Sequence, residues 1–192
     1  MTKYHGLMQV SAVLALLAQL VSSHASPPAA AATPAPVFPV TSGGGLTWAV
    51  PKAWVPGPSS AMRLATYFLP ASAGDAEKPE MAVFWFGPGK GGSVDANVER
   101  WFSQFAAAAG DPKPTRSLMR VGSLPVTLVT AAGTYSAGTG MGASPAAKSG
   151  FALRGAIAEG PNGALFFKLT GPRRSVAAAG KDFDALVASL KP

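Results

Sequence analysis

The chain has 192 residues, with 16 Lys or Arg against 9 Asp or Glu, a formal net charge of +7, no Cys and two His. The two histidines are His5 and His24, so residues 25–192 contain neither an imidazole nor a thiol. This composition excludes from that part of the chain disulfides, Ser-His-Asp and Cys-His catalysis, and His or Cys ligation of zinc, copper or haem.

The first 25 residues have the pattern of a secretory signal peptide. Lys3 precedes an apolar segment, 7–21, and the small residues Ser23 and Ala25 flank His24 where a signal peptidase would cut, after Ala25. The apolar segment is shorter than the roughly 20 residues that a bilayer span needs. We therefore expect an exported protein, periplasmic or extracellular, with no membrane span after cleavage.

A linker is expected between the signal peptide and the folded domain. Residues 26–45 are rich in Pro, Ala and Gly, and proline disfavours a helix and favours an extended chain. The folded domain is expected at 46–192, a length suited to one hydrophobic core.

The first part of this domain predicts three strands. Residues 46–50 alternate between apolar and polar side chains and end at Pro51, and residues 62–68 alternate again. Residues 81–86, Met-Ala-Val-Phe-Trp-Phe, are apolar on both faces, which is typical of a central strand covered on each side.

A helix is predicted at 94–109, after a glycine-rich loop. Ser93 is a good N-cap, and Gly110 ends the segment. Five apolar residues recur at helical spacing and form one stripe: Val94, Val98, Trp101, Phe102 and Phe105.

Strands and one helix are predicted in the second half. The strands are expected at 117–121, 124–134, 151–159 and 164–169, with a hairpin turn at Pro161-Asn162-Gly163 and a final helix at 173–190. Residues 137–150 have no pattern and are expected to form an excursion between strands. Adjacent strands joined by hairpins predict an α+β fold: a mostly antiparallel sheet of about six strands with helices on both faces, an α/β/α sandwich.

The element order and the tract GGSVDANVERWFSQF, 91–105, together with LTWAVPKAW at 46–54, resemble the PsbP-like α/β/α sandwich. The chain looks most like the small exported bacterial members of that group, which have no assigned activity. The better-known members are a lumenal accessory subunit of photosystem II and a Ran-binding import factor. The resemblance implies a domain that acts by docking on partners, and it transfers no functional residues.

The glycine-rich loop is the first candidate site. Gly87, Gly89 and Gly92 match G-x-G-x-x-G between a strand and a helix. Pro88 and the lack of an acidic residue at the end of a following parallel strand argue against a nucleotide. The alternatives are a generic anion held at the helix start and a turn with no ligand. The candidates here are Gly89, Lys90, Gly91, Gly92 and Ser93.

A second candidate lies along the predicted helix. Asn97, Arg100 and Gln104 share a face with Trp101 and could line a small polar groove. The alternative is that Trp101 belongs to the core and that Arg100 covers it with its aliphatic stem.

These observations favour a non-enzymatic binding or accessory module that docks on an unknown envelope protein or on a small ligand. No cofactor, metal, nucleotide or nucleic acid is expected. One alternative is an electrostatic binder of an anionic cell-surface polymer or lipid. It requires these basic residues to gather on one face: Lys52, Lys90, Arg100, Arg116, Arg120, Lys168, Arg173 and Arg174. The remaining alternative is an unusual hydrolase with Lys90 and Ser93 as a Ser-Lys pair.

Overall fold

The structure is a computed structural model that describes residues 41–58, 60, 63–137 and 146–192. The predicted signal peptide, 1–25, lies outside these residues, as does the predicted linker up to residue 40.

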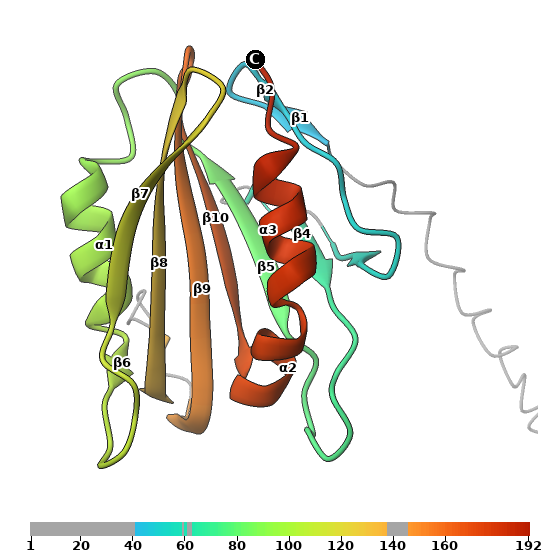
Figure 1. Cartoon of the computed structure of the whole chain (residues 1–192), viewed down its shortest axis with the longest axis vertical. Helices are drawn as coiled ribbons and strands as arrows, with labels where there is room; N and C mark the ends of the chain where they lie inside the picture. Colours follow the sequence, from blue (N-terminus) through green and yellow to red (C-terminus); the bar gives the residue numbers. More distant parts are fainter. Residues whose placement is uncertain (1–40, 59, 61–62, 138–145) are drawn as a thin grey trace, which may run out of the picture. The chain divides into compact units, whose positions relative to one another are not determined.

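Eight strands form one antiparallel sheet in the order β3-β4-β5-β10-β9-β8-β6, and β7 also pairs with β8 (Figure 1). The predicted α+β class with a mostly antiparallel sheet is therefore confirmed. The predicted number of about six strands is too low, partly because β3 and β6 have only two residues each and show no alternating pattern. The strands are β3 Val55–Pro56, β4 Ala65–Phe68, β5 Glu80–Trp85, β6 Phe105–Ala106, β7 Thr115–Val121, β8 Leu124–Tyr135, β9 Lys148–Gly160 and β10 Gly163–Pro172.

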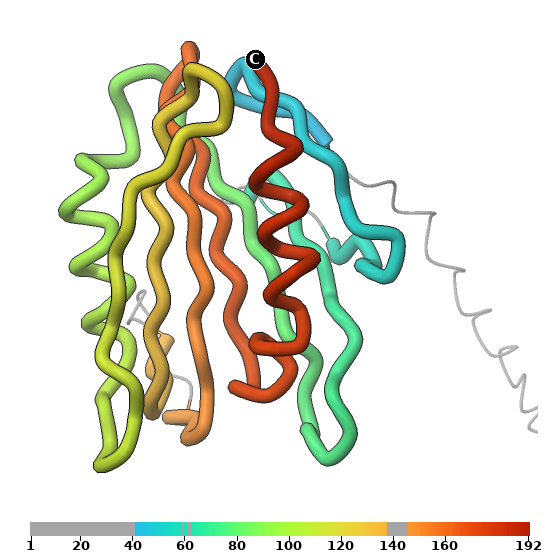
Figure 2. The backbone as a smooth tube through the Cα atoms, in the orientation of Figure 1, coloured from blue at the N-terminus to red at the C-terminus, as the bar shows by residue number. Residues whose placement is uncertain are grey.

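Tight hairpins join the long strands, whose course is visible in Figure 2. Val121 pairs with Leu124 at the turn between β7 and β8, and Gly160 pairs with Gly163 at the turn between β9 and β10. Gly163 therefore begins β10, whereas the sequence pattern predicts it inside the turn.

A separate hairpin marks the start of the described chain. β1, Ser42–Gly43, pairs with β2, Leu46–Thr47. Thr47 also exchanges backbone hydrogen bonds with Lys191, at 2.7 and 3.0 Å between nitrogen and oxygen. The folded part thus includes Ser42, inside the predicted linker, and the predicted strand 46–50 ends at Thr47.

The helices are shorter than the sequence predicts. They are α1 Val94–Phe102, α2 Arg173–Ala178 and α3 Gly180–Ala188. The predicted helix 94–109 stops early because Phe105 pairs with Tyr135 on β8, with their ring centroids 5.0 Å apart. The predicted helix 173–190 is divided at Ala179, beside a glycine that disfavours a helix interior.

The core consists of two clusters. Leu165 and Phe167 of β10 belong to the cluster that contains Phe183 of α3, and Phe166 between them belongs to the cluster that contains Trp101 of α1. Because successive residues of a strand point to opposite faces, the two clusters lie on opposite faces of β10.

Strand β5 lies inside the sheet, between β4 and β10, as its apolar composition predicts. Its residues Met81, Ala82 and Val83 are 0%, 5% and 0% exposed. Trp85 and the following Phe86 are 38% and 37% exposed, so the expectation that 81–86 is covered on both sides is wrong at this end. The open end of β5 borders the cavity described next.

Candidate functional site: an aromatic cavity beside α1

A cavity of about 380 Å³ lies between α1 and the strands β5 and β10. This volume is at the small end of the range of about 300–1,000 Å³ that is usual for ligand pockets. Half of the residues around it are aromatic and the other half are polar or cationic: Phe84, Phe86, Trp101 and Phe166, with Asn97, Arg100, Gln104 and Lys168.

The aromatic side chains form a continuous wall. The rings of Phe84 and Phe86 are nearly parallel, with centroids 6.2 Å apart. The rings of Phe86 and Trp101 each meet the ring of Phe166 edge to face, at 5.7 and 6.4 Å. Edge-to-face contacts are favoured by the quadrupoles of the rings, so the wall holds a defined shape.

Gly155 on β9 allows Trp101 to lie against the sheet. A Cβ atom at this position would be 2.6 Å from Cζ3 of Trp101 and 2.8 Å from Cγ2 of Val129. Gly155 pairs with Lys168 on one side and with Val129 on the other, in the middle of the sheet. The missing side chain therefore sets how closely α1 approaches β9 and β10.

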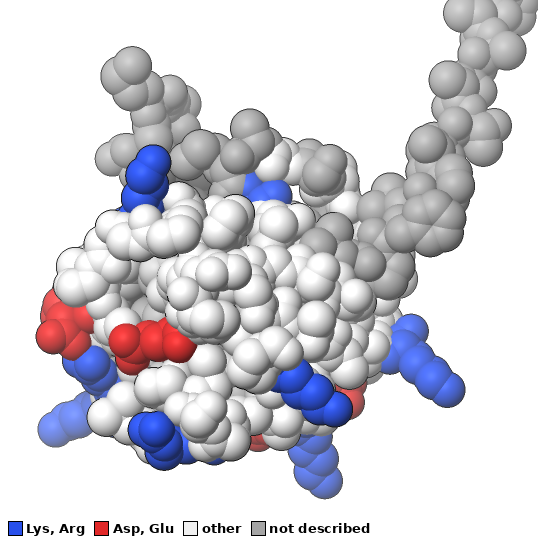
Figure 3. Space-filling view, turned by 90° about the horizontal axis from the view of Figure 1, so that it is seen from above, with Lys and Arg blue, Asp and Glu red and all other residues white. Residues whose placement is uncertain are grey.

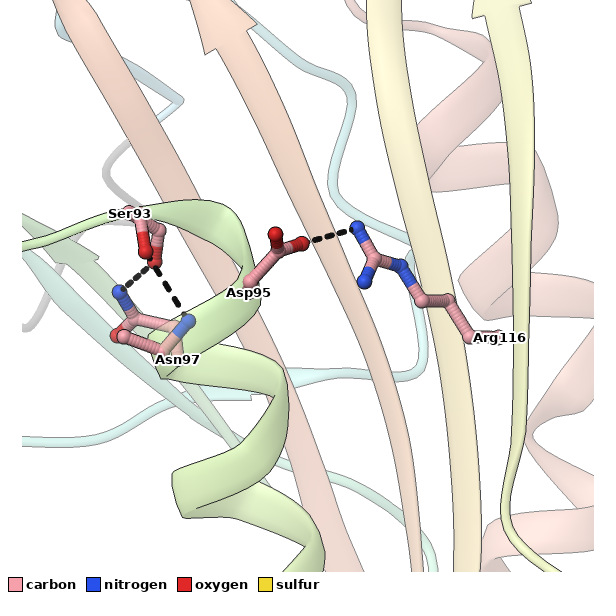
Figure 4. Close-up of polar contacts among 5 residues, drawn as sticks. Ser93, Asp95, Asn97 and Arg116 are labelled. Atoms are coloured by element: carbon pink, nitrogen blue, oxygen red, sulfur yellow. Dashed lines mark hydrogen bonds and ion pairs between the residues drawn. The ribbon is translucent and has the colours of Figure 1, made fainter.

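Asn97 fixes the start of α1 and orients Arg100. Its side chain is 1% exposed, and Nδ2 donates to the carbonyls of Gly91 and Ser93, at 2.8 Å each. Figure 4 shows Asn97 reaching back to Ser93. The Oδ1 atom accepts a hydrogen bond from Nη2 of Arg100. Asn97 thus holds the loop on one side and the guanidinium on the other.

The glycine-loop candidates lie outside the cavity lining. Gly89, Lys90, Gly92 and Ser93 are exposed. Gly91 has φ +92°, and a Cβ atom there would be 2.7 Å from the ring of Phe86. The absence of a side chain at Gly91 therefore allows the loop to pass close to the ring of Phe86.

The start of α1 is already capped by the chain itself. Oγ of Ser93 accepts the N–H of Ala96 at 3.1 Å. Asp95 in the first turn places a carboxylate there and forms an ion pair with Arg116 of β7 at 2.7 Å (Figure 4). A capping side chain and a carboxylate both compete with an anion at a helix start, so this geometry does not favour the predicted anion site.

Lys168 is a cation in the middle of the sheet. It is half-buried on β10, Nζ donates a hydrogen bond to Oε1 of Gln104, and Nζ lies 5.5 Å from the ring centroid of Tyr135. Burial, together with repulsion by Arg100 and Arg63, lowers the pKa of Lys168 to about 8, and Glu80 acts in the opposite direction. The amine is still mostly protonated at pH 7.

The cavity has an excess of positive charge. In the described part of the chain, neither Arg100 nor Lys168 forms an ion pair with a carboxylate. Glu80, the acid that acts on Lys168, is paired with Arg63 at 2.6 Å. Two cations therefore border the aromatic wall without an ion-pair partner among the described residues.

Part of this site could be predicted from sequence. Asn97, Arg100 and Gln104 line one cavity with Trp101, which is itself 4% exposed, so the groove and the core interpretations both describe this helix face. Four cavity residues outside this helix face were not predicted as part of the groove: Phe84 of β5, Phe86 after it, and Phe166 and Lys168 of β10. Lys168 was named only among the basic residues of the polyanion alternative. The available signal was a single lysine inside the otherwise apolar segment 164–169.

The basic residues required for polyanion binding are divided among different places. Lys52 borders α3, next to Asp182 and Leu186, whereas Arg100 and Lys168 border α1. Arg173 of α2 is paired with Asp111. In the view of Figure 3, Lys and Arg lie at separate places with uncharged surface between them.

In residues 41–58, 60, 63–137 and 146–192, no three His, Cys, Asp or Glu side chains are placed to hold a metal ion. Within the same residues, none of the helices has the length and apolar character required to cross a membrane.

Comparisons with known proteins found no matching family model and no matching curated protein. A solved structure of a Pseudomonas aeruginosa protein of unknown function is 16% identical, with a TM-score of 0.43, over 77% of this chain and 96% of that one. A Bacteroides thetaiotaomicron structure is 14% identical, with a TM-score of 0.41, over 79% of this chain and 47% of that one, so the chain spans about half of its length. Neither likeness identifies a family or an activity for this chain.

Proposed function

We propose that this protein is an exported binding module that holds a small ligand in the cavity beside α1 and has no catalytic activity of its own. The observation that carries the proposal is the combination of an aromatic wall with Arg100 and Lys168, which have no carboxylate partner among the described residues. A concave, largely apolar site with a few convergent polar groups is the usual form of a small-molecule site.

The chemistry of the side chains supports binding over catalysis. Residues 25–192 contain no His and no Cys, the commonest general base and a strong nucleophile. Lys90 and Ser93, the candidate hydrolase pair, are both exposed on the glycine-rich loop and its end, and neither lines the cavity.

We also propose that residues 1–25 direct export and that the domain is a PsbP-like α/β/α sandwich with helices on both faces of the sheet. The core clusters support this arrangement, because Trp101 of α1 and Phe183 of α3 pack against alternate residues of β10. Docking on an envelope protein would then be a second step, with the loaded or empty cavity presented to that partner.

The proposal is tested by filling the cavity. The purified protein, as processed by the host, is screened by saturation-transfer NMR against a set of small aromatic and aliphatic fragments. Gln104 lines the cavity, so Gln104→Trp fills it, whereas Glu99→Trp places the same side chain on an exposed position of α1. We expect fragments to bind the wild type and Glu99→Trp, and binding to be lost in Gln104→Trp. Equal binding to all three proteins, or no binding to the wild type, would contradict the proposal.

A further inference from the structure

We infer that the ligand of this cavity is a small aromatic carboxylate, with its ring against the wall of Phe84, Phe86 and Phe166 and its carboxylate between Arg100 and Lys168. The inference rests on the proposed function and names the class of ligand that the same cavity takes.

The cavity is lined by two positively charged side chains. Arg100 and Lys168 line the same cavity and lack a carboxylate partner among the described residues. Lys168 is half-buried, and holding a cation partly out of water without an opposite charge is unfavourable, so an anion bound beside it reduces that cost. Arg100 is exposed and adds a second positive charge to the same cavity. The neighbouring acid, Glu80, is already used by Arg63 at 2.6 Å. The missing charge is therefore expected from the ligand.

Both cations keep hydrogen-bond donors that a ligand can use. One nitrogen of the Arg100 guanidinium is held by Oδ1 of Asn97, which fixes the orientation of the group. A guanidinium has five N–H donors and a lysine ammonium has three, so both cations keep donors that a carboxylate can accept. Gln104 accepts one hydrogen bond from Lys168 and steadies it in the same way.

The position of the two cations favours a carboxylate over a phosphate. Phosphate sites are usually built from backbone N–H groups in a glycine loop or at a helix start. Here Ser93 caps the start of α1, and Asp95 places a carboxylate in its first turn. The cations lie instead on the flank of α1 and on β10. This arrangement fits a compact monoanion better than a phosphate.

The aromatic wall favours a ligand that contains a flat ring. Phe86 is 37% exposed, one of the few large apolar side chains that the described surface leaves open. The wall is made of rings in stacked and edge-to-face contact, which extend favourably to another flat ring. A volume of about 380 Å³ suits a small ring system and not a long acyl chain.

The test compares four probes by isothermal titration calorimetry: 2-naphthoate, the neutral 2-naphthalenemethanol, acetate and inorganic phosphate. We expect 2-naphthoate to bind about tenfold more tightly than the alcohol, because of the charge-assisted hydrogen bonds. Acetate and phosphate should show no measurable binding in the same range. Added NaCl should weaken the binding of 2-naphthoate and leave that of the alcohol unchanged, a readout that requires no variant.

Variants locate the carboxylate. Arg100→Gln and Lys168→Gln should each weaken 2-naphthoate about tenfold and leave the alcohol nearly unaffected. Lys90→Gln is the matched control, because Lys90 is exposed and lies outside the cavity lining; it should bind like the wild type.

The outcomes separate the inference from the proposed function. Equal affinity for 2-naphthoate and the alcohol, or phosphate binding as tight as that of 2-naphthoate, would overturn the carboxylate assignment and leave the binding module intact. If other fragments bind the cavity but neither naphthalene does, only the ligand class is wrong. If no fragment binds, the proposed function fails with it.

Discussion

Lys168 is a charged side chain between two fully buried ones, Phe167 and Leu169, on the strand at the centre of the sheet. Its pKa is about 8 in the folded protein, against a usual value of 10.5. Because the protonated form is disfavoured by folding, keeping this residue charged near neutral pH opposes stability. Such a cost is commonly found where a group serves binding.

Replacement of Lys168 by Met should therefore stabilise the protein at pH 7, by on the order of 1–3 kcal/mol. The folded pKa is the lower one, so the penalty is complete below about pH 8, decreases as the pH rises from 8 to 10.5 and is absent above that range. Tyr135, the titratable ring beside Lys168, has its pKa raised by burial and stays neutral over most of this range. Urea unfolding at pH 7 and pH 10 measures the difference.

The control for this prediction is Lys181→Met, on an exposed position of α3, which should change the free energy of unfolding little at either pH. A Lys168→Met protein that is less stable than the wild type at pH 7, or a difference that does not change with pH, would contradict the account of Lys168.

The contact of α1 with the sheet includes a close approach of Trp101 to one position of β9. Trp101 lies over Gly155, where a Cβ atom would be 2.6 Å from the indole ring and 2.8 Å from Val129. Neither neighbour can move freely, because Trp101 is 4% exposed and Val129 is 1% exposed.

Gly155→Ala should accordingly lower the free energy of unfolding by about 1–3 kcal/mol through overpacking. It should also weaken fragment binding, because Trp101 lines the cavity. Gly180→Ala is the matched control: the added Cβ atom would have Arg154 as its nearest neighbour at 3.6 Å, and alanine favours the helix. Denaturant midpoints of the three proteins measure the effect, and equal loss of stability in both variants would argue against close contact at Gly155.

The sequence predicts where helices and strands occur better than it predicts the residues at which they end. The spacing of Asn97, Arg100 and Gln104 along a helix was enough to place them on one face. The end of that helix was not predictable, because Phe105 also fits helical spacing and pairs instead with Tyr135, a residue 30 positions later in the chain. Likewise, only the pairing of β5 with β10 brings Phe86 and Lys168 to the same cavity. Local patterns contain no information on such long-range neighbours.

The formal net charge of the chain is +7, but the basic residues of the described part lie beside several different elements. The chain has nine acidic residues against sixteen basic ones. Five of the acids form ion pairs, on strands, helices and loops in different parts of the domain. Among the described residues, Lys52 borders α3 whereas Arg100 and Lys168 border α1, and on the face shown in Figure 3 the Lys and Arg side chains lie at separate places, which does not favour binding to a polyanion.

In the cavity, the positive charges of Arg100 and Lys168 lie next to apolar surface, and an anion is expected to bind beside Lys168. A heteronuclear NMR titration of the Lys168 side chain, with and without saturating 2-naphthoate, tests this claim most directly. We expect a pKa near 8 in the free protein and a clear increase when the carboxylate is bound, because an adjacent anion favours the protonated amine. A pKa near 10.5 that does not respond to 2-naphthoate would contradict the account.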